Sequence, residues 1–291
     1  MTQGDGTHRL SFLEANPIAI GGAGDPAEFA RELRRIGPLL PARSPLHMLD
    51  VACGTGAWSI HWRERGEIVT GLDFDLDLLA RARQRPGLGD PAGFRGVVAD
   101  ATKLPFKSGS FDLVMVNSLL EHVPDWKSAV VEAARVVAPG GVLVLHTTNR
   151  VHPFQGEVRG FPFYPWLPRP LRDRVLAWIM KHRRDLVNYT ESPAVNWFWP
   201  PELSEFTAAQ NLIVRDRLDL MRPEDLTGVR AIARWMLPKD GRPARARFLY
   251  WLATRSVSLY AKRPESQDSD RELASRAHSA SSRATNRRVI R

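Results

Sequence analysis

The sequence predicts an α/β fold built on a doubly wound, mostly parallel sheet with helices on both faces. From residue 46 onward, short apolar runs alternate with segments in which apolar residues recur at helical spacing. Several of these runs are apolar almost throughout, which is typical of strands buried on both faces of a parallel sheet. The first run leads into a glycine-rich turn and then a helix, an arrangement that doubly wound sheets use at their ligand edge.

Each predicted strand is a short apolar run that ends at turn residues. We expect strands at 46–52, 67–72, 94–99, 111–117, 142–147 and 257–261, with an extended segment at 212–220. Helical spacing predicts helices at 26–40, 58–65, 76–84, 126–137, 171–182, 202–210, 223–237 and 244–252. Asp25 is placed to cap the first helix, with Pro26 at its first position. Pro139-Gly140-Gly141 is expected to end the helix 126–137.

The chain divides into one main domain with elaborations. Residues 1–45 are expected to hold a loosely ordered start and a helix that covers the domain. Residues 46–263 form the domain itself, which contains a Pro-, Trp- and Phe-rich lid at about 150–201 and a helical insert at about 223–254. Residues 264–291 are rich in Ser, Arg and Ala and poor in apolar residues, so we expect a disordered tail.

The overall composition says more about the partners and the cellular location of the protein than about its activity. Lys and Arg outnumber Asp and Glu by 41 to 32, which favours anionic partners, although a GC-rich genome produces the same excess of Arg. The single cysteine allows no intramolecular disulfide and fits a reducing compartment. No secretory signal or membrane-spanning apolar run is apparent. We therefore expect a cytoplasmic protein with at most surface contact to a membrane.

The turn Ala52-Cys53-Gly54-Thr55-Gly56 follows Asp50 at the end of the first strand. Glycines at two positions allow unusual backbone dihedrals and close approach of a ligand. The helix behind the turn offers free N–H groups and a partial positive charge. These features suit a phosphate or the carboxylate of an amino acid.

Two further carboxylates narrow the choice of ligand. Asp73 ends the second strand, where an acidic residue binds ribose hydroxyls, and Asp100 ends the third, where it can accept a hydrogen bond from an exocyclic amine. The third glycine of a dinucleotide fingerprint is missing, and Trp58 would crowd a pyrophosphate. A nucleoside with an amino-acid tail therefore fits better than a dinucleotide.

Five segments occur in a fixed order and at compatible spacing: Leu49–Gly56, Gly71–Phe74, Ala99–Phe106, Phe111–Val114 followed by Leu120–Asp125, and Arg135–Leu143. Together they resemble the motifs of class I S-adenosylmethionine-dependent methyltransferases, in particular the type 11 subgroup that includes ubiquinone and menaquinone biosynthesis enzymes. The resemblance is close over residues 45–150. It implies a Rossmann-like fold of seven strands and S-adenosyl-L-methionine as cofactor.

The resemblance also implies which residues hold the methionine part of the cofactor. Gly54 and Gly56, with the backbone of Ala52 and Cys53, are expected to surround it. Asp50 ends the strand that leads into this turn and belongs to the same predicted site. Taken singly, each of these residues also fits an ordinary turn or helix cap.

The nucleoside part is expected to contact a second group of residues. The resemblance implies that Asp73 binds the ribose hydroxyls and that Phe74 lies against the nucleoside. It implies that Asp100 binds the adenine amine, with the backbone of Ala101 beside it. Asn117 is expected to line the site near the sulfonium.

Two residues after the fourth strand are candidates for catalysis. A hydroxyl acceptor usually needs a base, and His122 lies just past the strand with an ordinary pKa near neutrality. Glu121 is the second candidate. Similar quinone O-methyltransferases carry an additional Glu where this chain has Ser118, so no metal is expected. A histidine that only caps the turn at Pro124-Asp125 remains the alternative for His122.

The substrate is expected to lie under the lid. Phe163, Trp166 and Trp197 are candidates for binding a hydrophobic or planar acceptor, together with His146 near the end of the fifth strand. A small hydrophobic core within the lid is the alternative explanation of the same aromatic residues.

Residues 169–184 combine a basic character with apolar residues at helical spacing. Leu171, Val175, Trp178 and Ile179 are expected on one helical face, with basic residues around it. A basic amphipathic helix with Trp can lie on an anionic membrane, although the same periodicity describes any surface helix.

The expected activity is methylation of a small molecule, with oxygen as the acceptor atom and a hydrophobic, aromatic, isoprenoid or natural-product substrate. An RNA methyltransferase and an NAD-dependent oxidoreductase are the alternatives, followed by a non-enzymatic binding protein. Nucleic acid is disfavoured because Asn117-Ser118-Leu119-Leu120 stands where base N-methyltransferases carry an Asn/Asp-Pro-Pro-aromatic motif. The oligomeric state is left open.

Overall fold

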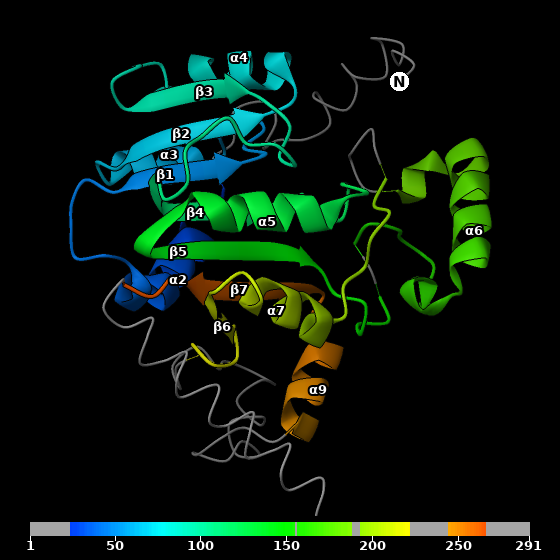
Figure 1. The fold of residues 1–291 in the computed structure, drawn as a ribbon. Coiled ribbons are helices and arrows are strands. Elements are labelled where there is room, and N and C mark those ends of the chain that lie inside the picture. Colours follow the sequence, from blue (N-terminus) through cyan, green and yellow to red (C-terminus); the bar gives the residue numbers. More distant parts are fainter. Residues whose placement is uncertain (1–23, 155, 188–192, 222–243, 266–291) are drawn as a thin grey trace, which may run out of the picture.

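Seven strands form a single sheet in the order β3-β2-β1-β4-β5-β7-β6, in the part of the chain that the computed structural model describes (residues 24–154, 156–187, 193–221 and 244–265; Figure 1). Strands β1 to β5 are parallel, whereas β7 runs antiparallel to both β5 and β6. Their bounds are β1 His47–Val51, β2 Ile68–Asp73, β3 Phe94–Val98, β4 Phe111–Asn117, β5 Val137–Thr148, β6 Ile213–Asp216 and β7 Ser256–Lys262. The predicted doubly wound, mostly parallel sheet is confirmed.

Helices cover both faces of this sheet. On one face, α2 (Pro26–Ile36), α3 (Ser59–Glu64) and α4 (Leu76–Gln84) bury an apolar cluster that includes Trp62 and Met115. On the other, α5 (Trp126–Val136) and α7 (Pro200–Ala208) bury the larger cluster around β1, β4 and β5. Polar side chains begin three of these helices, as expected for residues that satisfy free backbone N–H groups. Asp25, Asp75 and Asp125 each accept such a hydrogen bond.

Strand β5 begins earlier than predicted, at Val137 instead of Val142. Val137 pairs with Phe111 and Val142 pairs with Leu113, so that the residues between them form an irregularity within the strand. A Cβ on Gly141 would lie 2.9 Å from the carbonyl oxygen of Ala138, which explains why glycine stands there. The Pro-Gly-Gly segment is therefore part of a strand and not a loop before it.

The direction in which strands are added to the sheet reverses between β1 and β4. From β1 the chain builds outward through β2 and β3, and from β4 it builds the other way through β5. Ligands of doubly wound sheets bind at such a reversal, beyond the carboxyl ends of the strands. The first helix begins beside this region, since the N–H of Gly24, just before α2, donates to the carbonyl of Ala57 at 2.9 Å. Residues 1–23 lie outside the described part of the chain.

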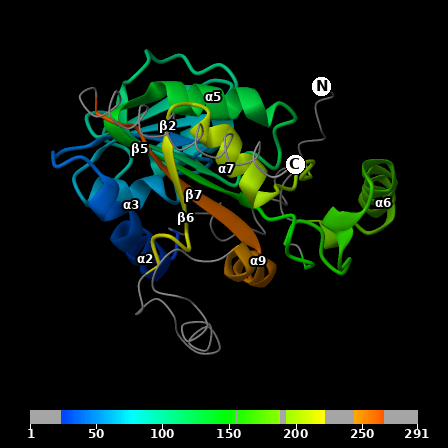
Figure 2. The same cartoon turned by 60° about the horizontal axis from the view of Figure 1, so that its bottom comes forward.

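The segment between β5 and α7 forms a small apolar core of its own. Helix α6 (Arg169–His182) contributes Ile179, which packs with Val158, Tyr164 and Trp197. Figures 1 and 2 both show α6 standing apart from the sheet, and Figure 1 places it beyond the arrowheads of the parallel strands. This position agrees with a lid over the carboxyl ends, although the division into domains stays a prediction.

The four apolar residues expected on one face of α6 differ in burial. Val175 and Ile179 pack against the core of the insert, whereas Leu171 and Trp178 are exposed. At 3.6 residues per turn the four lie within an arc of about 100°, with Ile179 at its buried edge and Trp178 at its exposed edge.

Some predicted elements lie partly or wholly outside the described residues. Helix α9 (Ala244–Ala253) confirms the predicted helix 244–252, while residues 223–243 lie outside the described residues, as does the predicted tail from residue 266 onward. The remaining boundaries agree with the prediction to within about two residues, except that α2 ends at Ile36 instead of residue 40 and β6 ends at Asp216 instead of residue 220.

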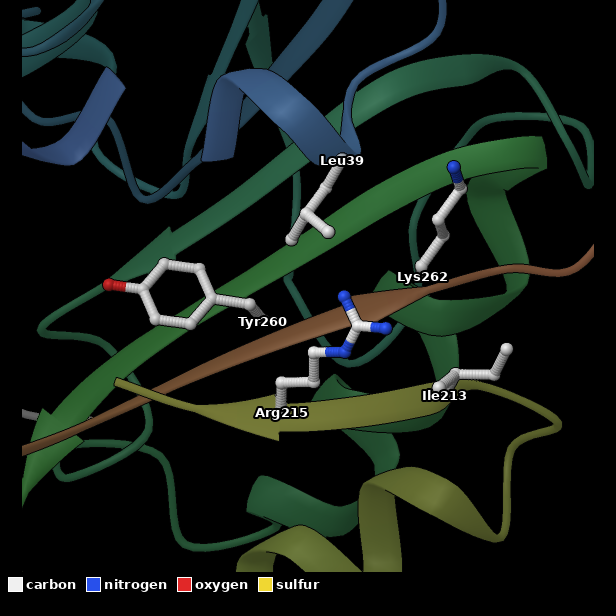
Figure 3. Close-up of a pocket in the computed structure, with 5 residues that line it drawn as sticks. All are labelled: Leu39, Ile213, Arg215, Tyr260 and Lys262. Atoms are coloured by element: carbon white, nitrogen blue, oxygen red, sulfur yellow. The ribbon is translucent and has the colours of Figure 1, made fainter. Parts of the chain in front are cut away.

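A small hollow lies away from the carboxyl ends of the parallel strands. It is lined by Leu39, Ile213, Arg215, Tyr260 and Lys262 (Figure 3). Lys262 pairs with Val142 and Tyr260 with Val144, several residues before the end of β5, whereas the candidate site lies at the strand ends. The hollow is therefore not part of the candidate site.

Candidate cofactor and active site

The glycine loop joins β1 to α3 in a backbone conformation that depends on its glycines. Gly54 and Gly56 have φ of +54° and +76°, and Ala52 also has a positive φ of +59°. A Cβ on Gly56 would lie 2.5 Å from Cδ1 of Leu88, so this glycine lets the loop pack against the end of α4. A Cβ on Gly54 would meet nothing within 4 Å among the described residues. The space beside Gly54 is thus open to a ligand.

Asp73 lies at the end of β2 and contacts the glycine loop directly. Its Oδ2 accepts a hydrogen bond from the N–H of Gly54 at 2.8 Å, and its Oδ1 accepts one from the N–H of Asp75 at 3.0 Å. The N–H of Cys53 donates to the carbonyl of Leu72 at 3.0 Å. Burial raises the pKa of Asp73. The loop and the predicted ribose-binding residue therefore form one rigid unit.

Asp50 is buried beneath this loop. Oγ of Ser59 donates to its Oδ2 at 2.6 Å, which ties the first residue of α3 to the end of β1. Burial raises the pKa of Asp50 to about 6. Its carboxylate orients the loop and the helix behind it, and its predicted contact with the cofactor stays a prediction.

The predicted nucleoside residues line the neighbouring strand ends. Phe74 follows β2 with 77% of its surface exposed, which leaves its ring available to a planar ligand. Asp100 is exposed, and its Oδ1 accepts hydrogen bonds from the N–H and Oγ1 of Thr102, both at 2.8 Å. Ala101 is buried behind it. The N–H of Ala99 donates to the carbonyl of Asp73 at 3.1 Å, so the two loops are adjacent.

Asn117 and His146 are register partners at the ends of β4 and β5. Nδ2 of Asn117 is buried, and no acceptor among the described residues lies within hydrogen-bond distance. A buried donor without an acceptor is costly, so a ligand atom would stabilise it. His146 instead shares a hydrogen bond with Oγ of Ser258 at 2.9 Å. Burial, with a smaller effect of Arg217, lowers its pKa to about 4, so His146 is neutral near pH 7.

Glu121 is a buried carboxyl at the carboxyl ends of the strands. Oγ1 of Thr147 donates to its Oε2 at 2.7 Å. Burial raises its pKa to about 7, more than the Thr147 hydrogen bond lowers it, with a further rise from nearby Glu157. Its protonation therefore changes near neutrality. His122 follows it, half-buried, in a turn closed by its own N–H, which donates to the carbonyl of Leu119 at 2.9 Å.

The predicted substrate aromatics fall into two groups. Phe163 and Trp166 are both exposed, with ring centroids 4.9 Å apart. Nε1 of Trp166 donates to the carbonyl of Arg150 at 2.8 Å, which fixes its ring. Trp197 is only 7% exposed and packs edge-on against Tyr164 within the core of the insert. The structure gives Trp197 a packing role, which was the alternative for these aromatic residues.

Two polar residues near the site were not predicted from the sequence. Arg85, just after α4, is buried and donates from Nη2 to Oγ1 of Thr55 at 2.7 Å and from Nε to the Thr55 carbonyl. Asn196 donates from Nδ2 to the carbonyls of Leu120 and Val123, at 3.0 and 2.7 Å. Each links segments distant in sequence, and no local pattern marks such a contact.

The residues at the carboxyl ends fit the cofactor that the sequence predicts. The open space beside Gly54, the exposed ring of Phe74 and the unmatched donor of Asn117 border the same end of the sheet. The described residues contain no group of three or more His, Cys, Asp or Glu side chains that could hold a metal ion.

Comparison with known proteins agrees with this arrangement. Residues 49–145 match a family model described as a methyltransferase domain. A malonyl-[acyl-carrier protein] O-methyltransferase of Salmonella typhimurium is 38% identical over 109 residues, which cover 38% of this chain and 41% of that protein. A demethylmenaquinone methyltransferase of Oceanobacillus iheyensis is 32% identical over 148 residues, 47% of this chain and 61% of that protein. The chain thus matches less than two thirds of either relative.

A solved structure shows the same fold. The S-adenosylmethionine-dependent methyltransferase from Mesorhizobium loti superposes with a TM-score of 0.51 at 20% identity, over 80% of this chain and 97% of that one. The strand order, the glycine loop and the family match lead to one conclusion. Residues 49–145 match a methyltransferase domain, and the sheet that contains them has the fold of the S-adenosylmethionine-dependent enzyme from Mesorhizobium loti.

Proposed function

We propose that this protein transfers a methyl group from S-adenosyl-L-methionine to an oxygen atom of a small hydrophobic molecule. The observation that carries the proposal is the unit formed by Gly54 and Asp73, which leaves open space beside the glycine and an acidic side chain at the end of β2. The family match of residues 49–145 supports the choice of methyl donor.

The chain's own residues would position the cofactor. The backbone of Ala52 to Gly56 holds its methionine part, Asp73 accepts hydrogen bonds from the ribose hydroxyls, and Asp100 accepts one from the adenine amine. The sulfonium of the bound cofactor supplies an already activated methyl group, so the protein mainly contributes position and electrostatics.

An oxygen acceptor needs a group that takes its proton. Two neighbours at the end of β4 are candidates: Glu121, whose pKa is raised to about 7, and His122. A base whose pKa lies near the working pH combines the correct protonation state with adequate basicity. We assign the role of base to His122 first and to Glu121 second, because Glu121 already accepts a hydrogen bond from Thr147.

The insert would supply the acceptor site. Phe163 and Trp166 present exposed rings, and Trp166 donates to the carbonyl of Arg150, two residues after the end of β5; rings of this kind bind planar or isoprenoid groups. The names of the two relatives, which include an O-methyltransferase and a quinone-type substrate, support an oxygen or hydrophobic acceptor. Peripheral membrane contact through residues 169–184 belongs to the same proposal. No helix of the described residues is long and apolar enough to cross a bilayer.

Isothermal titration with S-adenosylhomocysteine tests the first step. We expect saturable binding at a single site and no binding of NAD⁺ under the same conditions. Binding of NAD⁺ alone would instead support the oxidoreductase alternative. A screen of phenolic, quinol and carboxylic acceptors with labelled S-adenosylmethionine then identifies the acceptor class. Label found only in added RNA would overturn the small-molecule proposal.

A further inference from the structure

One face of helix α6 carries large apolar side chains that no part of the described structure covers. Leu171 is 46% exposed and Trp178 is 52% exposed. They are seven residues apart, two turns or about 10 Å along the helix, and so lie on the same line. Arg174 lies between them on this line and Lys181 follows it, both exposed. We call Leu171, Arg174, Trp178 and Lys181 the α6 stripe.

The stripe is not needed to hold the helix in place. A different face of α6 packs Val175, Ile179 and Met180 into the core of the insert. The guanidinium of Arg172 lies 4.9 Å from the ring centroid of Trp197 on the same inner side. The helix therefore has two apolar faces, one inward and one outward. Exposing Leu and Trp to water costs free energy that an external partner would recover.

The charge of the segment indicates what kind of partner fits. Residues 169–184 contain six Lys or Arg side chains and one carboxylate, Asp173. That carboxylate lies 3.8 Å from Arg169, which leaves the cations of the stripe without an acidic neighbour on their own line. Large apolar side chains interleaved with cations match a surface that has an apolar interior beneath an anionic layer.

The position of α6 suits such a surface. In both views of the fold the helix stands away from the sheet at the periphery of the molecule (Figures 1 and 2). Phe163 and Trp166, in the turn before α6, are also exposed. An outward helix can reach a flat bilayer without obstruction, whereas an apolar side chain that binds a folded protein usually enters a pocket of its partner.

We propose that the α6 stripe binds the surface of a bilayer that contains anionic lipid, and that the acceptor is an amphiphile that reaches the carboxyl ends of the strands from that bilayer. The second part rests on the proposed methyl transfer, whereas the first does not. Leu171 and Trp178 would enter the boundary between headgroups and acyl chains, while Arg174 and Lys181 would pair with lipid phosphates.

Vesicle co-sedimentation of the full chain tests the membrane contact without any methyl donor. We expect binding at low salt to phosphatidylcholine vesicles that contain phosphatidylglycerol, little binding to phosphatidylcholine alone, and release at high salt. A basic residue at an anionic surface contributes about fivefold to partitioning. The double variant R174E/K181E should therefore lose more than roughly twentyfold, and Trp178→Ser should lose binding at unchanged charge.

Matched controls separate the stripe from general effects of charge and folding. Arg34 and Arg83 are exposed on α2 and α4, so R34E/R83E reverses the same number of charges elsewhere. Val131→Ser replaces an exposed apolar residue on α5. Equal loss in the control and stripe variants, or vesicle binding that survives R174E/K181E, would overturn the proposal. So would binding of poly-glutamate in preference to the vesicles, which would assign the stripe to an acidic protein.

The membrane contact and the methyl transfer can be disproved independently of each other. Titration with S-adenosylhomocysteine should be unchanged in R174E/K181E, because the stripe lies outside the cofactor site. Vesicle binding with no cofactor binding would overturn the methyl-transfer proposal and leave the membrane contact standing. Cofactor binding with no vesicle binding would overturn the membrane contact and leave the methyl-transfer proposal standing.

Discussion

The backbone N–H of Gly54 donates to Oδ2 of Asp73 at 2.8 Å, although the two residues are 19 positions apart in the chain. One carboxylate thus shapes the glycine loop and stands at the end of β2, where the ribose is expected. We therefore expect loop conformation and cofactor binding to be coupled.

Replacement of Asp73 should remove the hydrogen bond that shapes the glycine loop and should weaken cofactor binding. A hydrogen bond to a charged group contributes about 1.5–3 kcal/mol, so Asp73→Ala is expected to weaken binding of S-adenosylhomocysteine by roughly tenfold to hundredfold. Isothermal titration measures this effect. Asp77→Ala, at an exposed position on α4, is the control and should bind normally. Unchanged affinity in Asp73→Ala would contradict the assigned role.

Gly54 allows a test of the open space beside it. Gly54→Ala places a Cβ where no described atom lies within 4 Å, so its cost in folding is that of a positive φ, about 1 kcal/mol. The same Cβ would stand in the path of the methionine part, and cofactor binding should fall by at least about tenfold, or 1.4 kcal/mol. Gly66→Ala is the matched control, since Gly66 has φ of +86° and equal space around it. Calorimetric melting and titration of both variants separate strain from ligand exclusion.

Arg85 is expected to position the loop from behind. Its guanidinium is buried and holds both the hydroxyl and the carbonyl of Thr55. Arg85→Met keeps the length of the side chain but removes its two hydrogen bonds to Thr55, which should cost about 1–3 kcal/mol of stability. Cofactor affinity should fall with it. Arg83→Met, exposed on the preceding turn, should change neither the melting temperature nor the affinity.

Glu121 should make stability depend on pH. Its pKa is raised from 4.5 to about 7 by burial, so the folded state binds the proton more tightly than the unfolded state does. The free energy of unfolding should therefore be highest below pH 4.5 with respect to this group and fall as the pH rises through 7. Glu121→Gln is neutral throughout, and above pH 7 it should gain up to about 3 kcal/mol relative to wild type. Urea unfolding from pH 4 to 8 measures the difference, and exposed Glu205→Gln should parallel wild type.

His122 and Glu121 can be separated by kinetics once an acceptor is known. If His122 is the base, His122→Asn should lower kcat by about 10²-fold with little change in KM. The acidic limb of the pH profile should disappear in this variant and persist in Glu121→Gln. Loss of that limb only in Glu121→Gln would transfer the role to the carboxyl.

Much of the fold follows from local patterns. Strand β4 and helix α4 begin and end at the predicted residues because turn and capping residues bound their apolar runs. The start of β5 could not be predicted from local patterns, because it depends on the pairing of Val137 with Phe111, which is a contact between two strands. The burial of the apolar residues of α6 could not be predicted for a related reason: Leu171 and Ile179 are both apolar, and only packing against the insert decides which is buried.

The sequence by itself determined the fold class, the glycine loop and the acidic residues that end β2 and β3, since backbone propensity and motif spacing are written along the chain. Only the tertiary structure decided how these residues are held. The contacts of Ser59 with Asp50, Thr147 with Glu121 and Arg85 with Thr55 join positions 9, 26 and 30 residues apart. Such contacts form only in the folded chain, where burial raises the pKa of Asp50 and Glu121 more than the hydrogen bonds from Ser59 and Thr147 lower it.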